Sequence, residues 1–248
     1  MKKNKIGKII ILGLSALLIL LVAGMFIWSR TGTYPAKSVA LSALESSDMV
    51  TVTQDEFIVF TPAEETQIGL VFYPGGLVEP AAYAPVLHGI AESGVLVVIT
   101  PMPLNLAIFD TNAANAAMAE FPQITTWFIA GHSLGGAAAG IYAENNPGQI
   151  NGLALWDSYP PQSADLSDNV LVVYSIYGTT DEFPNTDNFD DNRVLLPATA
   201  AYFPIEGASH AQFGDYGPQT GDVEPVISLS AQHEAVLAIM LEFVHSNP

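Results

Sequence analysis

A short glycine-rich motif around Ser133 carries the clearest chemical signal in the chain. Gly131, Ser133 and Gly135 follow the G-x-S-x-G pattern, between an apolar run at 127–130 and a run of small residues at 137–143. In a strand–turn–helix context this pattern makes a sharp turn that exposes the serine hydroxyl at a helix N-terminus. Free N–H groups at such a terminus stabilise negative charge. The motif predicts that Ser133 is a nucleophile, and an accidental Gly/Ser turn is the alternative interpretation.

A serine nucleophile needs a histidine base. His210 lies in a loop just past the last predicted strand, where loops open at the same sheet edge as the nucleophile. We therefore predict that His210 is the general base. The other histidines are expected to be non-catalytic: solvated for His233 and His245, at the surface for His88, and packed beside the turn for His132.

The base in turn needs a carboxylate that holds its tautomer. Asp181 follows the predicted strand at 170–177, and its Gly-x-x-Asp turn is typical of the acid position in this kind of site. Asp157, directly after the strand at 152–156, is the rival candidate, and the neighbouring Glu182 is a weaker one. We predict Asp181 as the acid, with Asp157 as the alternative.

Acyl transfer also needs two N–H donors for the developing oxyanion. The amide of Leu134, the residue after the nucleophile, is the expected first donor. The second is expected in the turn at 74–77, where glycine lets the backbone approach closely. Gly76 is the preferred donor and Leu77 the second choice, although an ordinary Pro-Gly turn is the alternative.

The wider pattern of strands alternating with helices predicts an α/β fold, with a mostly parallel sheet and helices on both faces. The short connection between Trp156 and Val170 leaves no room for a separate lid domain. We expect strands over 49–54, 56–60, 68–73, 95–100, 125–130, 152–156, 170–177 and 201–205, and helices over 80–93, 111–120, 133–145, 187–195 and 230–244, the last capped by Ser230.

The sequence near the N-terminus predicts a segment that spans a membrane. Residues 9–28 are almost wholly apolar, about one membrane span, and four lysines precede them. We predict an uncleaved signal anchor over residues 1–30, a stalk over 31–48 and a catalytic domain over 49–248. This places the protein in the cell membrane as a single-pass protein with an extracytoplasmic domain. A cleaved signal peptide and a secreted protein are the alternative.

Charge and composition limit the classes of partner and ligand that the protein can bind. All 25 acidic residues follow position 40, whereas Arg193 is the only basic residue after Lys37. Such a surface repels phosphate, so we exclude nucleic acid as a partner. The chain has no cysteine, which excludes disulfides and thiolate metal sites. We expect no metal and no cofactor.

Four segments resemble the bacterial α/β-hydrolase superfamily, and in particular its small lidless alpha/beta hydrolase fold-5 family. They are 73–76, 131–136, 177–181 and 210–217, and the resemblance runs from about residue 50 to the C-terminus. It implies hydrolase activity without indicating a substrate. The triad that it implies is Ser133, Asp181 and His210.

Taken together, these features favour a serine hydrolase that cleaves small carboxylic esters through an acyl-enzyme. A small-molecule ester is the expected substrate, and the membrane is expected to be a partner through the N-terminal helix. The alternative is a non-catalytic surface module that kept the fold and binds a ligand.

Overall fold

The computed structural model describes residues 2–180 and 192–246. The chain divides into two units, one ending at Thr33 and the other beginning at Tyr34. The first unit is a helix, α1 (Lys2–Gly32). Its stretch from Ile11 to Gly32 has a mean hydropathy of 2.6, and by length and composition it could cross a membrane. A signal sequence would have the same properties.

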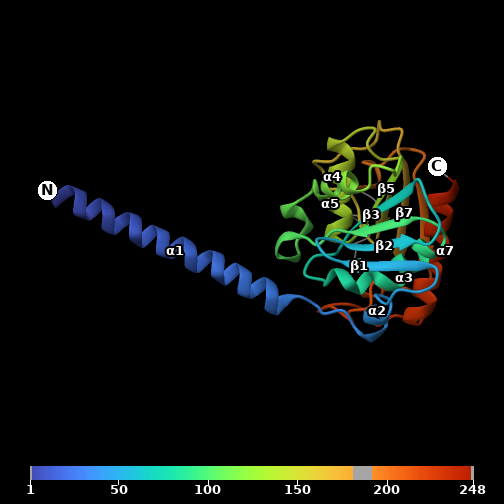
Figure 1. The fold of residues 1–248 in the computed structure, drawn as a ribbon, viewed down its shortest axis with the longest axis horizontal. Helices are drawn as coiled ribbons and strands as arrows, with labels where there is room; N and C mark the ends of the chain where they lie inside the picture. Colours follow the sequence, from blue (N-terminus) through green and yellow to red (C-terminus); the bar gives the residue numbers. More distant parts are fainter. Residues whose placement is uncertain (1, 181–191, 247–248) are drawn as a thin grey trace. The chain divides into compact units, whose positions relative to one another are not determined.

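The second unit is built on a sheet of eight strands in the described residues (Figure 1). The strand order is β1-β2-β4-β3-β5-β6-β7-β8, and the pairs β1/β2 and β2/β4 are antiparallel while all others are parallel. The strands are β1 (Val50–Gln54), β2 (Ile58–Pro62), β3 (Ile68–Tyr73), β4 (Leu96–Ile99), β5 (Thr126–His132), β6 (Gly152–Trp156), β7 (Val172–Gly178) and β8 (Ala201–Ile205).

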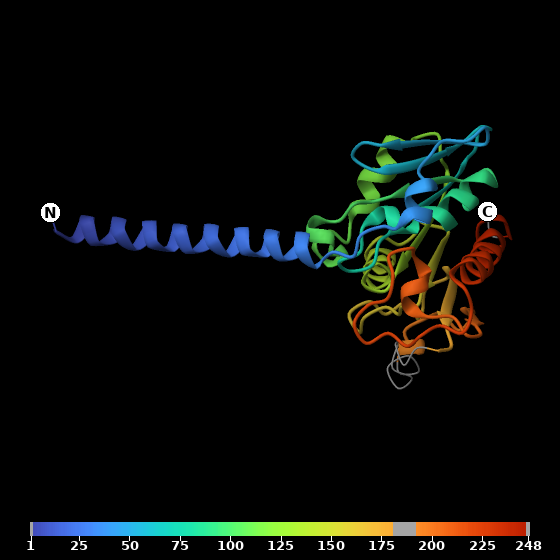
Figure 2. The same ribbon diagram turned by 90° about the horizontal axis from the view of Figure 1, so that it is seen from below.

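Helices cover both faces of this sheet, which explains why its central strands are apolar without alternation. One face packs against α3 and α7, and the other against α4 and α5 (Figure 1, Figure 2). The helices are α2 (Ser38–Ser42), α3 (Ala84–Glu92), α4 (Ala113–Glu120), α5 (Leu134–Asn145) and α7 (Leu229–Ser246), with short 3-10 turns η1 (Pro80–Tyr83), η2 (Pro103–Asn105), η3 (Ala107–Phe109) and η4 (His210–Phe213).

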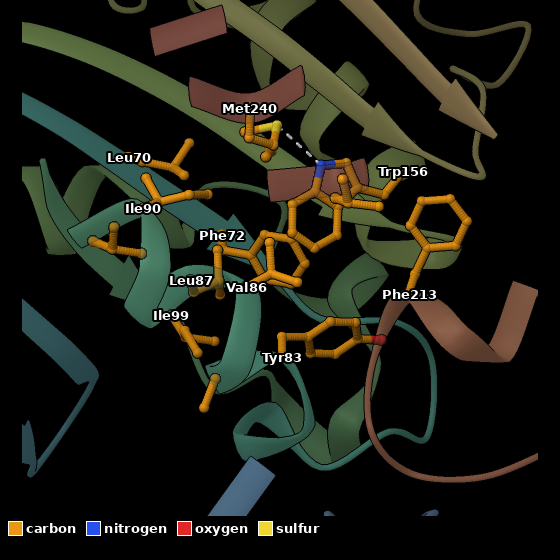
Figure 3. Packing of buried hydrophobic residues seen from close by; sticks show 14 of the residues in the cluster. Leu70, Phe72, Tyr83, Val86, Leu87, Ile90, Ile99, Trp156, Phe213 and Met240 are labelled. Atoms are coloured by element: carbon orange, nitrogen blue, oxygen red, sulfur yellow. Dashed lines mark hydrogen bonds between the residues drawn. The ribbon is translucent and has the colours of Figure 1, made fainter. Parts of the chain in front are cut away.

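Aromatic side chains fill the core on the α3/α7 face (Figure 3). The rings of Phe72 and Trp156 lie 4.8 Å apart between centroids, and Phe72 lies equally close to Tyr83. The indole N–H of Trp156 points at the sulfur of Met240 at 3.2 Å. This contact gives the buried N–H of Trp156 a partner and joins α7 to the end of β6.

The predicted α/β fold is confirmed, and the expected strands lie within a few residues of those in the structure. The connection between β6 and β7 is described throughout and contains no helix or strand, as expected without a lid. The predicted cap of the last helix is wrong: α7 begins at Leu229, and the hydroxyl of Ser228, not Ser230, accepts from the amide of Ala231. Most of the helix expected at 187–195 lies outside the described residues.

Part of the segment predicted as a stalk is hydrogen-bonded to the second unit. Tyr34 forms a parallel bridge with Val78. The amide of Lys37 donates to the carbonyl of Asp215, and the amide of Ala40 in α2 donates to its carboxylate. Residues from Tyr34 onward therefore belong to the compact unit that carries the sheet.

Candidate active site

Ser133 stands at a strained turn between β5 and α5. Its backbone has φ 52° and ψ −122°, which non-glycine residues rarely adopt. Two hydrogen bonds hold the turn from β6 and the loop that follows it: the Ser133 amide donates to the carbonyl of Trp156 at 3.1 Å, and the hydroxyl of Ser158 donates to the carbonyl of Ser133 at 2.7 Å. This is the sharp strand-to-helix turn that the motif predicts, and it is called the elbow.

The glycines of the motif are there because the turn leaves no room for side chains. A Cβ at Gly131 would lie 2.5 Å from the carbonyl carbon of Gly135. A Cβ at Gly135 would lie 2.1 Å from the carbonyl oxygen of Tyr73, at the end of β3. Substitution at either position would therefore displace the backbone that carries Ser133.

His210 and Asp157 form a buried pair at the same edge of the sheet. His210 begins η4, after β8, and its Nδ1 lies 2.6 Å from Oδ2 of Asp157. Asp157 follows β6 with φ 45°, and its Oδ1 accepts from the amide of Gly178 at 3.2 Å. Only 3% of His210 and 1% of Asp157 is exposed. Burial raises the pKa of Asp157, and the hydrogen bond to His210 opposes that rise.

The loop that carries His210 is clamped by a glutamine that sequence reasoning missed. Gln232, on α7, accepts from the amide of Ser209 at 3.0 Å and donates to its carbonyl at 2.8 Å. The side chain of Gln232 is fully buried. In the sequence it is one polar residue in an amphipathic helix, and nothing there marks it as a partner of a loop 23 positions away.

Asp181, the predicted acid, and Glu182 lie outside the described residues. The strand that precedes them, β7, ends at Gly178. Among the described residues, the acid that contacts the side chain of His210 is Asp157, the alternative candidate. Both acids follow neighbouring parallel strands, so both were expected at the same sheet edge.

The turn after β3, residues 74–77, carries the amide of Gly76, which is expected to be an oxyanion donor, and it is named the oxyanion loop for that expectation. A Cβ at Gly76 would lie 3.4 Å from Cβ of Leu134, so the two expected donors are adjacent. Within the described part of the chain, neither the Gly76 amide nor the Leu134 amide donates a hydrogen bond. The amides on either side of Gly76 are used: Gly75 donates to Tyr83, and Leu77 donates to Asn105 at 2.7 Å.

A small open cavity lies beside Ser133. Its volume is about 240 Å³. It is lined by Ser133, Leu134, Ala137, Asp157, Ser158 and Tyr159. Among the residues with described positions, no group of three His, Asp or Glu side chains is arranged to hold a metal ion.

Not all of the other histidines are as exposed to solvent as the sequence predicts. His132 is fully buried beside the elbow, with its ring centroid 4.4 Å from that of His210. The prediction of a solvated His233 is wrong, because this residue is only 9% exposed on the buried side of α7. His88 bonds the carbonyl of Ala43 through Nδ1, and His245 is exposed.

Comparison with known families decides the affiliation. The sequence pattern of the Alpha/beta hydrolase family matches residues 69–234, which include the elbow and His210. The chain belongs to this alpha/beta hydrolase family. The resemblance noted in the sequence is thereby confirmed. Comparison with curated protein sequences finds no match.

Solved structures share the fold at low sequence identity. TT1662 from Thermus thermophilus has a TM-score of 0.56 and 16% identity, over 79% of this chain and 98% of that one. Est1E from Butyrivibrio proteoclasticus has a TM-score of 0.53 and 15% identity, over 79% and 98%. The carboxylesterase CesB (YbfK) from Bacillus subtilis has a TM-score of 0.60 and 11% identity, over 84% and 95%. The chain thus has an alpha/beta hydrolase fold whose structural neighbours include an esterase.

Proposed function

We propose that the protein is a serine hydrolase that cleaves small carboxylic esters, with Ser133 as nucleophile, His210 as base and Asp157 as the acid that orients it. The observation that carries this proposal is the buried 2.6 Å contact of His210 with Asp157, at the edge where the elbow turns. A buried carboxylate on Nδ1 leaves Nε2 as the nitrogen that exchanges protons with the serine.

The reaction follows the order of acyl transfer. The Ser133 oxygen attacks the ester carbon while its proton passes to Nε2 of His210. The carbonyl oxygen becomes an oxyanion, which the amides of Gly76 and Leu134 stabilise. The C–O bond then breaks, and the alcohol leaves with the proton from His210. Water attacks the acyl-enzyme by the same steps, which releases the acid and restores Ser133.

The cavity supports a small substrate. With about 240 Å³ beside Ser133, it is below the range of about 300–1,000 Å³ of drug-sized ligand sites. The acidic surface of the second unit favours neutral or cationic esters over anionic ones, because like charges repel. Because the cavity is small, we expect turnover to fall steeply as the acyl chain lengthens.

The test combines covalent labelling with a chain-length series. A fluorophosphonate probe should label the wild-type protein and not Ser133→Ala, and p-nitrophenyl esters should be hydrolysed best when the acyl chain is short. His210→Ala should lose both activities while remaining folded by circular dichroism. A folded wild-type protein that neither labels nor turns over any ester would indicate a binding module instead.

We propose that α1 remains as a single-pass anchor, with the N-terminus in the cytoplasm and the catalytic unit outside. The 22-residue apolar stretch from Ile11 and the lysines that precede it support this orientation. The mass of the mature protein tests the anchor. Loss of about the first 25–35 residues would instead indicate a cleaved signal and a secreted enzyme.

A further inference from the structure

Two buried side chains that the proposed reaction does not use connect the loops that carry it. Tyr83 ends η1, and His132 ends β5, directly before Ser133. Neither side chain is exposed. The hydroxyl oxygen of Tyr83 lies 2.8 Å from Nδ1 of His132. The same oxygen accepts a hydrogen bond at 3.0 Å from the amide of Gly75, in the oxyanion loop.

The directions of these hydrogen bonds follow from the protons available. The Gly75 amide donates to the Tyr83 oxygen, which still has its single hydroxyl proton to donate. We assign that proton to the hydrogen bond with Nδ1 of His132, and this assignment places the ring proton on Nε2. Burial lowers the pKa of His132 far below 6.5, and neighbouring His210 lowers it further, although a backbone hydrogen bond of His210 acts in the opposite direction. His132 is therefore a neutral acceptor for Tyr83.

The oxyanion loop lies close against the side chains of Tyr83 and His132. A Cβ on Gly75 would lie 2.7 Å from the Tyr83 oxygen and 2.8 Å from Nδ1 of His132. Glycine is needed at this position because any larger residue would push the loop away from the pair. The next peptide carries the Gly76 amide, which is the proposed oxyanion donor.

The same pair also contacts the loop of the base. The His132 ring stacks on Phe213 at 5.6 Å with an interplanar angle of 17°, and lies 4.4 Å from the ring of His210. The amide of Asp215 donates to the carbonyl of Ala82, next to Tyr83. In Figure 3 the hydroxyl of Tyr83 points toward the side of the core on which Phe213 lies.

We propose that Tyr83 and His132 are positioning residues that fix the Gly76 amide relative to Ser133 and His210. This inference rests on the proposed esterase function and adds to it a support that spans three loops. Its physical basis is that an oxyanion donor acts only when it is held in place before the reaction begins. A displacement of about 1 Å can lower a rate by about 100-fold.

The first test removes the Tyr83 hydroxyl from the full-length protein in detergent. Tyr83→Phe should lower kcat by about 10- to 100-fold, because the Gly76 amide is displaced rather than removed, while KM changes less. Tyr142→Phe is the matched control. It removes the hydroxyl of another buried tyrosine, bonded to Asn115 on the opposite face of the sheet, and should keep the wild-type kcat. Rates are normalised to active sites titrated with a fluorophosphonate.

A transition-state analogue separates positioning from a general loss of structure. The Ser133 oxygen adds to the carbonyl carbon of an alkyl trifluoromethyl ketone, its proton passes to His210, and the ketone oxygen becomes an oxyanion. In Tyr83→Phe the inhibition constant should rise by the same factor as kcat/KM falls. A variant that is only less stable would lose active sites without this change.

Substitutions of His132 provide a rescue test that does not depend on Tyr83→Phe folding. His132→Asn keeps an acceptor at the place of Nδ1 and should retain most of the turnover, whereas His132→Leu should lose it. Equal turnover in the two variants, or a Tyr83→Phe enzyme with wild-type kcat and inhibition constant, would overturn the positioning role alone. If the wild-type protein had no esterase activity, the proposed function would be rejected, and the positioning role would be rejected with it.

Discussion

Oδ2 of Asp157 lies 2.6 Å from Nδ1 of His210, although the two residues are 53 positions apart. The other carboxylate oxygen accepts from the amide of Gly178, at the end of β7. Both oxygens are thus occupied by donors from different elements, which fixes the carboxylate and, through it, the plane of the imidazole. A carboxylate that follows β6 therefore makes the contact with His210 that was predicted for Asp181, which follows β7.

Amide substitutions distinguish the two candidate acids. Asp157→Asn should lower kcat by about 10,000-fold, because an amide on Nδ1 favours the wrong tautomer of His210. Asp181→Asn is the matched control and should stay close to wild type. Steady-state ester hydrolysis by the folded variants measures both. The reverse pattern would assign the acid to Asp181.

Removing the glutamine clamp should loosen the loop of the base. Gln232→Leu leaves the buried amide of Ser209 unpaired and removes one of the two donors to its carbonyl, which keeps only the amide of Gln212. This should lower the free energy of unfolding by about 1–3 kcal/mol and lower kcat as well. Glu234→Gln, an exposed change on the same helix, should have little effect. Urea unfolding and ester turnover are the measurements. Equal stability of the two variants would contradict the clamp.

The segment after α1 should contribute to stability. A chain beginning at Thr33 keeps the hydrogen bonds of Tyr34, Lys37 and Ala40, whereas one beginning at Glu45 loses them together with α2. At about 1 kcal/mol for each bond, less the entropy of ordering the segment, we expect the shorter chain to be less stable by about 2 kcal/mol. Thermal and urea unfolding compare the two. Equal stability would be the behaviour of a true stalk.

The buried neutral histidine should make stability depend on pH. The pKa of His132 is lowered in the folded state, so the unfolded chain binds more protons once the pH falls below about 6.5. The free energy of unfolding should therefore fall as the pH drops, by about 1 kcal/mol at pH 5.5 from this residue.

Other groups act on the same measurement. His233, whose pKa is also lowered by burial, adds a change of the same sign, while the raised pKa of Asp157 acts in the opposite direction. Tyr83 and His210 are the titratable groups closest to the His132 ring. His132→Asn should remove about 1 kcal/mol of the pH dependence between pH 7.5 and 5.5 in urea unfolding. An unchanged dependence would mean that His132 is not neutral in the folded protein.

Most of the fold could be predicted because its signals are local. The apolar runs of β3 and β5, bounded by turn residues, indicate strands buried on both faces, and the glycines around Ser133 indicate a sharp turn. The cap of α7 was misplaced by two residues, because Ser228 and Ser230 are equally good caps by composition. Burial of His233 could not be predicted, because it depends on what packs against that side of the helix.

The sequence by itself determined the strand–turn–helix at Ser133, the histidine that follows the last strand and the glycine turn after β3, because each depends on residues a few positions apart. Only the tertiary structure decided that Asp157 lies on His210, and that Tyr83 bridges His132 and Gly75. Parallel strands bring several acids to one edge of the sheet. The 2.8 Å contact of the Tyr83 hydroxyl oxygen with Nδ1 of His132 depends on packing between elements far apart in the chain. Spacing along the sequence does not encode that packing.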